Sequence, residues 1–263
     1  MIDLPRISSR DNAKLKYLRS LKERRESNDI FVEGRRLAEE VLRTELDVPL
    51  AVIGPDFGAC DRRAELLHRL VTRCANVYVV PENMIAQIAD TDSPQGILMA
   101  VQKPPAARKQ IEKLAEGVVV YLHQISNPSN LGALFRTAEA AGCSGVAISS
   151  RSADAYSPKA VRASMGSVFR LPIWENAPEE EFLRLMKGNG FRMTVADITG
   201  KAYYDVDWSM PRVVIFGSEA HGVPQNLINL ADDRVTIPMA NRVESLNLAA
   251  SAAVILFEVA RSG

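Results

Sequence analysis

Downstream of residue 117, short apolar runs alternate with helical segments, and this alternation constrains the fold more strongly than any other feature. We predict strands over residues 118–125, 146–149, 191–196, 213–216 and 234–238. Helices are predicted over residues 131–141, 158–167, 179–187 and 224–230, and from residue 246 onward. Apolar strands separated by helices are typical of a mostly parallel sheet that is covered on both faces. Ligands of such sheets bind where the strands end, so the loops after these strands are the expected place for chemistry.

The first hundred or so residues predict a second, smaller α/β unit. Helices are expected over residues 12–27, within 31–46 and over 64–74, and strands over 50–54, 77–80 and 97–101. Between residues 101 and 111, the paired Pro104 and Pro105 favour extended backbone, so we place an interdomain linker there. The chain of 263 residues is long enough for two cores. We assign residues 1–106 to a first domain with its linker and residues 107–263 to a second domain.

The charge of the chain excludes an overall positive field for binding a polyanion. Lysine and arginine number 32, as do aspartate and glutamate, so any nucleic-acid surface must be local. Basic side chains gather in the first segment, where only Asp11 and Glu23 oppose them: Arg6, Arg10, Lys14, Lys16, Arg19, Lys22, Arg24 and Arg25. This segment is either a phosphate-binding surface or a helix face that only meets solvent, and its composition alone leaves both readings open.

Several other classes of protein lack their signatures here. The apolar runs are too short to cross a bilayer and residues 1–10 do not resemble a signal peptide, so we expect a cytoplasmic protein without a membrane partner. Cys60, Cys74 and Cys143 are scattered, which predicts neither a disulfide framework nor a metal site. The absence of a GxGxxG or GxxxxGK[ST] motif disfavours a dinucleotide enzyme and a P-loop enzyme.

The loop after the first strand of the second domain leads into a helix with one candidate functional arginine. Ser129 or Asn130 is predicted to cap this helix. Its expected core stripe is Leu131, Leu134, Phe135 and Ala138, with Gly142 as its stop. Arg136 lies off the stripe and less than two turns from the predicted start of the helix. It is therefore either an ordinary surface arginine or a side chain that reaches toward a ligand at the end of the sheet.

Two further loops carry glycines and polar residues after strands. Residues 217–224 contain Gly217 and Gly222, which permit close approach of backbone amides to a ligand, whereas the lone His221 is more typical of a solvated histidine. Residues 238–247 lead into an alanine-rich helix that we expect to be buried on most faces. Ser245 and Asn247 at its entrance could simply cap the helix, although this explanation does not account for the glycine loop and Arg136 in equivalent positions.

Together, these loops resemble the motifs of the SpoU (TrmH-like) family of the SPOUT superfamily of RNA methyltransferases. The first motif is similar to Asn-x-Gly-x-x-x-Arg-Thr-Ala over residues 130–138, and the second to Phe-Gly-Ser-Glu-x-x-Gly over residues 216–222. The third is similar to Ile-Pro-Met at residues 237–239 followed by Ser-Leu-Asn at residues 245–247. Residues 157–167 resemble the substrate-side loop and helix of the family. The departures are Asn127, where many relatives carry aspartate, and Ala220-His221 inside the second motif.

The N-terminal part is similar to the small ribosomal-protein-like RNA-binding domain that precedes many SpoU catalytic domains. This similarity covers residues 31–34 and 93–96 and shifts the interpretation of the basic helix toward RNA contact. It also favours ribosomal RNA, 23S in particular, over tRNA. A non-catalytic RNA-binding factor for ribosome assembly and a small-molecule enzyme that uses another nucleotide remain as alternatives.

The resemblance implies an S-adenosylmethionine-dependent RNA 2′-O-ribose methyltransferase. The implied fold has a trefoil knot in the C-terminal domain, and the implied assembly is a homodimer without a metal ion. The resemblance assigns catalysis to Asn130, Arg136, Glu219, Ser245 and Asn247 and cofactor binding to Gly217, Ile237, Met239 and Leu246. RNA contacts are expected from Arg162 and Ser164, together with the basic side chains of Lys14, Lys16, Arg19, Lys22, Arg24 and Arg25.

The role of Arg136 stays open at this point. The family assigns it to activation of the ribose hydroxyl, but a guanidinium is effectively never deprotonated in a protein. Arg136 could bind the adjacent phosphate, stabilise the developing alkoxide, or act as a base only together with that phosphate.

Overall fold

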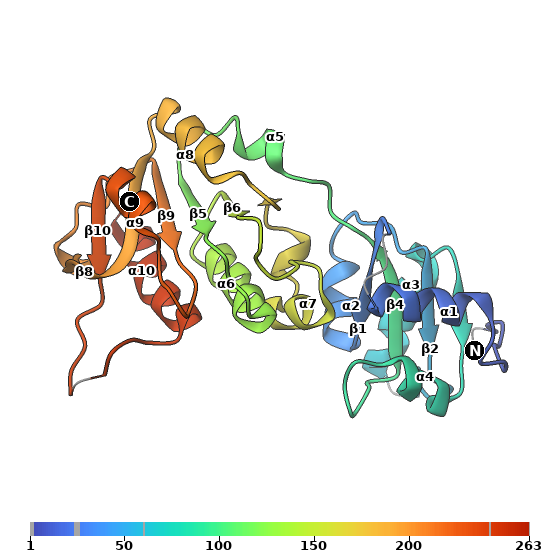
Figure 1. Cartoon of the computed structure of the whole chain (residues 1–263). Helices are drawn as coiled ribbons and strands as arrows, with labels where there is room; N and C mark the ends of the chain where they lie inside the picture. The colour runs from blue at the N-terminus through green and yellow to red at the C-terminus, as the bar shows by residue number, and fades with distance from the viewer. Residues whose placement is uncertain (1–2, 24–26, 60, 242, 263) are drawn as a thin grey trace. The chain divides into compact units, whose positions relative to one another are not determined.

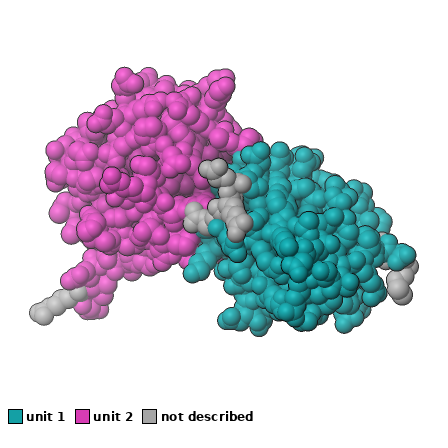
Figure 2. All heavy atoms as spheres, turned by 45° about the vertical axis from the view of Figure 1, so that its right-hand side comes forward, with its two compact units in different colours: residues 1–104, 156–169 teal, residues 105–155, 170–263 magenta. Residues whose placement is uncertain are grey.

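The computed structural model describes residues 3–23, 27–59, 61–241 and 243–262, with the side chains of residues 61–63 left out. The chain separates into two compact units, which Figure 2 colours separately. Unit 1 contains residues 1–104 and 156–169, and unit 2 contains residues 105–155 and 170–263. The boundary at residues 104 and 105 lies within the paired prolines of the expected linker. The helix at residues 158–164 groups with unit 1, although it comes from the second half of the chain.

Unit 1 is built on a four-stranded mixed sheet in the order β1-β4-β2-β3 (Figure 1). The strands are β1 (Asp29–Glu33), β2 (Leu50–Ile53), β3 (Val77–Val79) and β4 (Ile97–Gln102). Strand β4 runs antiparallel to both β1 and β2, whereas β2 and β3 are parallel. The helices of this unit are α1 (Ala13–Lys22), α2 (Arg35–Val41), α3 (Asp61–Arg73), α4 (Glu82–Ile88) and α7 (Pro158–Ser164), followed by a 3-10 turn η1 (Ser167–Phe169).

Unit 2 contains a six-stranded, wholly parallel sheet in the order β10-β8-β9-β5-β6-β7. The strands are β5 (Val118–Leu122), β6 (Gly145–Ile148), β7 (Ile173–Trp174), β8 (Arg192–Ala202), β9 (Arg212–Phe216) and β10 (Asp233–Thr236). The connecting helices are α5 (Arg108–Ile111), α6 (Pro128–Ala140), α8 (Glu179–Gly188), α9 (Gln225–Leu230) and α10 (Leu248–Ser262), with a 3-10 turn η2 (Tyr203–Asp205). The predicted parallel α/β architecture is confirmed.

Helices cover both faces of the parallel sheet, as its apolar strands require. Alternate residues of a strand point to opposite faces. Helices α8 and α9 pack on one face of the sheet. Their shared buried cluster includes Val119, Tyr121, Val213, Ile215, Phe182, Leu183, Met186 and Leu227. Helix α10 packs against α6, whose predicted core stripe is buried as expected.

Inside this sheet lies a fully buried arginine, Arg212 at the start of β9. Its Nη1 donates to Asp233 Oδ2 of β10 at 2.8 Å and also to the hydroxyl of Thr194 in β8. Its remaining donors reach the backbone carbonyls of Asp207 and Ser209. Since a buried charge needs partners for all its donors, this network joins the three strands β8, β9 and β10.

Burial of the closing helix differs from the prediction. Along α10, the fully buried side chains are Ala252, Ile255, Leu256 and Val259, at the spacing of one helical face. On another face Phe257 is 51% exposed. The prediction of burial on most faces is therefore wrong for the single chain, because only one stripe of α10 has other elements of this chain to pack against. No helix within the described ranges is long and apolar enough to cross a membrane.

Candidate active site

The first loop is organised by Asn127, which caps α6. Its Oδ1 accepts the N–H groups of Ser129 at 2.9 Å and Asn130 at 3.4 Å, and Pro128 occupies the first helical position. The prediction that Ser129 or Asn130 caps the helix is wrong, because Asn127 followed by proline is the stronger start signal. As a result, Asn130 lies in the first turn of α6. Either asparagine or aspartate can accept these hydrogen bonds. Asn127, where many relatives carry aspartate, therefore preserves the cap.

The second loop is a tight turn that presents Glu219 to solvent. The N–H of Gly222 donates to the carbonyl of Ser218 at 2.8 Å, and Gly222 has a φ of 65°. A Cβ on Gly217 would lie 2.0 Å from the backbone carbon of Gly222, so only glycine fits there. The two glycines therefore close the loop and leave Glu219 and His221 exposed at its tip.

The third loop ends at Asn247, directly before α10. Its Oδ1 accepts the N–H of Ala249 at 2.9 Å, so Asn247 satisfies a backbone donor in the first turn of the helix. Its side-chain Nδ2 at the same time donates to Asn130 Oδ1 at 3.2 Å. One side chain therefore caps the helix and also contacts the first loop, so capping alone does not account for Asn247.

A hydrogen-bond chain joins these three loops. Asn130 Nδ2 donates to Glu219 Oε1 at 2.8 Å, while Asn130 Oδ1 accepts from Asn247. The amide of Asn130 thus connects the loops that follow β5, β9 and β10. We call this set, Asn130, Glu219 and Asn247, the three-loop network.

The network lies where the strand order of the sheet reverses. From β5 the chain builds outward to β6 and β7, and it then returns to place β8, β9 and β10 on the other side of β5. The loops after β5 and β9 therefore flank the topological switch point, where open α/β sheets bind their ligands. The bond between Asn130 and Glu219 spans these two loops.

Arg136 is exposed and lies apart from the three-loop network. Because α6 begins at Pro128, Arg136 is more than two turns from its N-terminus, and the shorter predicted separation is wrong. Arg136 is six positions after Asn130 in the sequence, a spacing that puts the two side chains on different faces of the helix. Among the described residues, its guanidinium has no hydrogen-bond or ion-pair partner. Its N–H donors are therefore available to an acceptor from another molecule.

The expected cofactor-binding residues follow β9 and β10. Gly217 is buried directly after β9, Ile237 and Met239 are partly exposed after β10, and Leu246 is 40% exposed before α10. Over the described residues of 237–247, the only backbone hydrogen bond within the segment joins Val243 N–H to the carbonyl of Ala240. Free main-chain donors and acceptors beside accessible apolar side chains fit a bound nucleoside. Ser245 is exposed in the same segment, and no bond joins it to the three-loop network.

The basic side chains of α1 project from a helix whose other face is in the core of unit 1. Each described one already contacts its own chain. Lys14 lies over the ring of Tyr78 at 4.9 Å, and Lys16 pairs with Asp11 at 3.2 Å. Arg19 donates to the carbonyl of Arg10, and Lys22 donates to that of Ala89. Arg24 and Arg25 lie outside the described residues.

The two candidate RNA contacts on α7 have different environments. Arg162 is partly exposed and its Nη1 donates to Asp90 Oδ2 at 2.6 Å. Ser164 is 0% exposed, and its hydroxyl donates to the carbonyl of Val161. A buried and satisfied hydroxyl cannot reach RNA in this conformation, which argues against Ser164 as an RNA contact.

One contact near the site is absent from the sequence interpretation. At the end of β5, His123 Nδ1 lies 2.7 Å from Glu179 Oε2 at the start of α8. Glu179 Oε1 also accepts from Asn226 Nδ2 at 3.0 Å, in the helix that follows the glycine loop. Glu179 thus lies against His123 after β5 and accepts a hydrogen bond from Asn226 after β9, although His123 Nδ1 makes no hydrogen bond of its own. Their wide separation along the chain leaves no local signal for the contact.

Comparison with known families decides what this sheet and its loops belong to. A model described as the SpoU rRNA Methylase family matches residues 117–257, more than half of the chain. The chain belongs to the SpoU rRNA methylase family. A second model, described as an MRM3-like substrate binding domain, matches residues 12–99.

Relatives of this SpoU chain match nearly its whole length. An uncharacterized tRNA/rRNA methyltransferase of Synechocystis is 31% identical over 98% of this chain and 94% of its own. The 23S rRNA (guanosine(2553)-2′-O)-methyltransferase of Bacillus subtilis is 28% identical over 97% and 99%. The crystal structure of an AdoMet-bound rRNA methyltransferase from Sinorhizobium meliloti superposes with a TM-score of 0.84, at 31% identity and 98% coverage of both chains.

The SpoU family membership confirms the expectations of a parallel-sheet methyltransferase domain, a preceding substrate-binding domain and an enzyme that uses S-adenosylmethionine. The family is one of RNA 2′-O-methyltransferases. The roles of individual side chains, the boundaries of the functional domains and the knot stay predictions.

Proposed function

We propose that this protein transfers the methyl group of S-adenosylmethionine to a ribose 2′-hydroxyl of 23S ribosomal RNA. The observation that carries the proposal is the three-loop network at the switch point of the sheet, built from side chains of all three SpoU motifs. The B. subtilis relative, whose name gives the same reaction on 23S rRNA, supports the choice of RNA.

The residues of the site have distinct roles in this proposal. Methyl transfer from a sulfonium needs alignment of the acceptor and removal of its proton, and it needs no covalent enzyme intermediate. Asn130, Glu219 and Asn247 hold the three loops in register, so they position the ribose. Arg136, whose guanidinium has no partner in the described structure, contacts the phosphate beside the ribose or the developing alkoxide. Ser245 lies in the same segment as Asn247 and completes the proposed set.

When bound, S-adenosylmethionine supplies the activated methyl group. The backbone of Gly217, Ile237, Met239 and Leu246 would hold its nucleoside, and the exposed side chain of Leu246 would pack against the adenine.

The proposed active assembly is a homodimer of knotted C-terminal domains, with residues 1–106 as the RNA-binding domain and residues 107–263 as the catalytic domain. The exposed Phe257 beside the buried stripe of α10 supports a surface that a second copy covers. The basic residues of α1, with Arg162, are proposed to contact RNA phosphates, and the proposed location is the cytoplasm.

The test is to map ribose methylation in RNA from cells with and without the gene, and to restore methylation at the affected site with purified protein and S-adenosylmethionine. We expect one 23S rRNA position to lose its 2′-O-methyl group. Loss at a tRNA position instead would correct the substrate. An unchanged methylation map, together with purified protein that binds ribosomal particles without binding S-adenosylmethionine, would support an assembly factor.

A further inference from the structure

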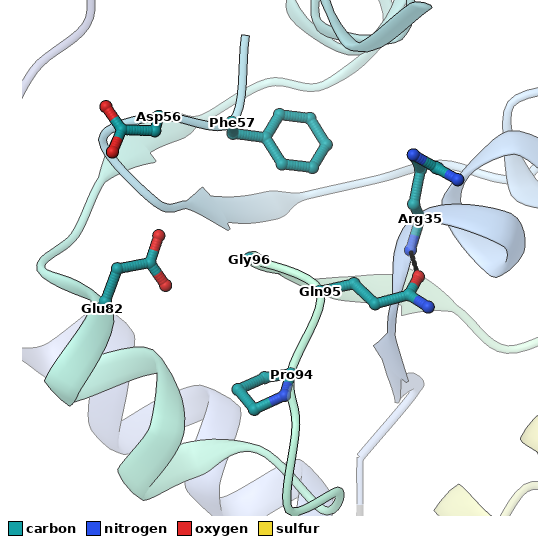
Figure 3. A pocket seen from close by; sticks show the side chains of 7 residues that line it. All are labelled: Arg35, Asp56, Phe57, Glu82, Pro94, Gln95 and Gly96. Carbon is teal, nitrogen blue, oxygen red and sulfur yellow. Dashed lines mark hydrogen bonds between the residues drawn. The ribbon is translucent and has the colours of Figure 1, made fainter. Parts of the chain in front are cut away.

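Unit 1 contains a cavity of about 360 Å³ whose lining residues all lie outside the SpoU motifs. It opens at the sheet edge where β1 and β2 end and β4 begins. Gly96, the residue before β4, and the side chain of Phe57 form part of its wall, and the side chains of Arg35, Asp56, Glu82 and Gln95 surround it (Figure 3). Since polar side chains from four separate segments converge on one hollow, the cavity has the character of a specific polar binding site.

Buried hydrogen bonds hold the walls of this cavity in place. The carboxylate of Glu33, which is 6% exposed, accepts the N–H of Asp90 at 2.6 Å and the hydroxyl of Thr91. The segment after α4 is thereby tied to β1. Gln95 Oε1 accepts the N–H of Arg35 at 2.9 Å, which fixes the side chain of Gln95 over the start of α2 and leaves its Nε2 as a donor.

The charges of the cavity are divided between its two sides. Figure 3 shows the carboxylates of Asp56 and Glu82 on one side and the Arg35 guanidinium on the other. Within the described residues, neither carboxylate has a hydrogen-bond or ion-pair partner. The Nε of Arg35 is buried without a hydrogen bond and lies 3.9 Å from Glu39 Oε1. A Cβ on Gly54 would lie 1.9 Å from Glu82 Oε1, so the glycine makes room for this carboxylate.

This arrangement selects a ligand with donors on one edge and acceptors on the other. Two carboxylates repel a phosphate, so the RNA backbone does not fit the acidic side. Guanine presents N–H donors at N1 and N2 and acceptors at O6 and N7. Adenine and cytosine have an acceptor where a carboxylate would need a donor. Single-stranded segments of RNA are the parts whose bases can leave the stack and enter such a pocket.

We propose that this cavity binds an unstacked guanine base of the RNA substrate, with the carboxylate of Glu82 accepting from N1–H and N2–H and with Arg35 and Gln95 donating to O6 and N7. The base is a recognition element on unit 1, separate from the ribose that is methylated. The inference rests on the proposed function, because RNA is the partner that would bring guanine to this surface.

The test uses the full-length protein and a fluorescently labelled RNA hairpin whose uridine loop carries one central guanosine. Matched hairpins carry inosine, which lacks only the 2-amino group, or adenosine at that place. We expect wild-type protein to bind the guanosine hairpin roughly 10-fold more tightly than either matched hairpin, the scale of one paired base edge. Glu82→Gln should abolish the difference between guanosine and inosine. Arg35→Gln should weaken both of these complexes, since both bases keep O6 and N7.

Glu65→Gln, in α3 and outside the cavity, is the matched control and should retain the guanosine preference. Circular dichroism and thermal denaturation should be equal in all variants and show that unit 1 is folded in each one, and affinity for S-adenosylmethionine should also be equal. Equal binding of the three hairpins by wild-type protein overturns the proposal. The proposal also fails if Glu82→Gln keeps the base preference; weaker binding of that variant to ribosomal particles would then assign the cavity to a protein partner. Failure of the proposed function is seen separately, as the absence of methyl transfer by wild-type protein.

Discussion

The side-chain amide of Asn130 connects all three SpoU motifs through its two ends. Its Nδ2 donates to Glu219 and its Oδ1 accepts from Asn247, so asparagine is the residue type that satisfies both neighbours. An aspartate has no donor for Glu219, and two carboxylates at hydrogen-bond distance cannot both stay ionised at little cost. The identity of this residue therefore matters more than its size.

We predict that Asn130→Asp lowers single-turnover methyl transfer by about 10-fold or more, the lower end of the effect of losing a positioned group, while the folded structure persists because the position is accessible. Asn83→Asp, on α4 and far in sequence from the motifs, is the control and should behave like the wild-type protein. Wild-type turnover in Asn130→Asp would show that the three-loop network does not align the reacting groups.

Arg136 is exposed and has no partner among the described residues, so its proposed role toward RNA can be tested by substitution. We predict that Arg136→Ala reduces single-turnover methyl transfer at saturating RNA by roughly 100-fold, with nearly unchanged affinity for S-adenosylmethionine. Arg136→Lys should restore little, because lysine lacks the planar fork of donors. If Arg136→Ala instead turns over normally and binds RNA weakly, Arg136 is a docking residue only.

Helix α6 begins at a cap, Asn127, that precedes the first motif. We predict that Asn127→Ala destabilises the fold by about 1 kcal/mol, the usual cost of removing an N-cap side chain, and lowers activity by loosening the first turn that carries Asn130. Asn127→Asp should keep both properties, since aspartate accepts the same N–H groups. Chemical denaturation measures the first effect and methyl transfer the second. A stable Asn127→Ala protein would contradict the importance of this cap.

Helix α1 tests whether the basic segment contacts RNA. We predict that replacing Lys14, Lys16 and Arg19 with glutamine weakens RNA binding and lowers its salt dependence by up to about three phosphate equivalents, roughly 0.7 log units each. Turnover at saturating RNA should stay near wild type, since the helix belongs to unit 1. RNA affinity is measured across a salt series. If the slope of log affinity against log salt concentration is unchanged, the basic side chains of α1 only face solvent.

Most elements of unit 2 could be predicted because strong apolar runs end at glycine, proline or asparagine. The predicted strands overlap β5, β6, β8, β9 and β10. In contrast, β1 and α4 are not predicted, although Gly34 follows β1 and Pro81 precedes α4. Both are short: β1 has five residues and α4 has seven. The two residues of β7 carry no periodicity at all. Short elements are decided by the sheet and the helices around them rather than by their own residues.

The candidate site could be predicted in part for the same reason. Motif spacing identifies Asn130, Glu219 and Asn247, but only the fold shows that they bond to one another. The pair of His123 with Glu179 and the cavity at Arg35 depend on long-range packing, which local pattern does not encode.

The sheet of unit 2 contains a fully buried charge, the guanidinium of Arg212, which pairs with Asp233. Burial alone would raise the pKa of Asp233, but hydrogen bonds from Arg212 and Arg192 outweigh it and hold the pKa below its ordinary value of 3.8. A carboxylate with a lowered pKa stabilises the fold above its unfolded pKa, and this stabilisation is lost as the pH falls through the folded pKa. The contribution of Asp233 should therefore be complete at neutral pH and disappear in acid.

We predict that Asp233→Asn destabilises unit 2 by about 3 kcal/mol at neutral pH, because the fully buried Arg212 loses its carboxylate. The difference in stability from the wild-type protein should begin to shrink below about pH 4, where the unfolded wild-type carboxylate takes up a proton, and should disappear below the lower folded pKa. Denaturation across a pH series measures both, and Asp232→Asn at the neighbouring exposed residue is the comparison. If the difference in stability between the two proteins does not depend on pH, packing rather than charge accounts for the contribution of Asp233.

The three-loop network also has a consequence for the timing of synthesis. Asn247 is translated 117 residues after Asn130, its hydrogen-bond partner. A nascent chain can therefore form the sheet strands and the first two loops on the ribosome while the third loop is still missing. The network is therefore completed only after the third loop has been synthesised and has folded onto the first two.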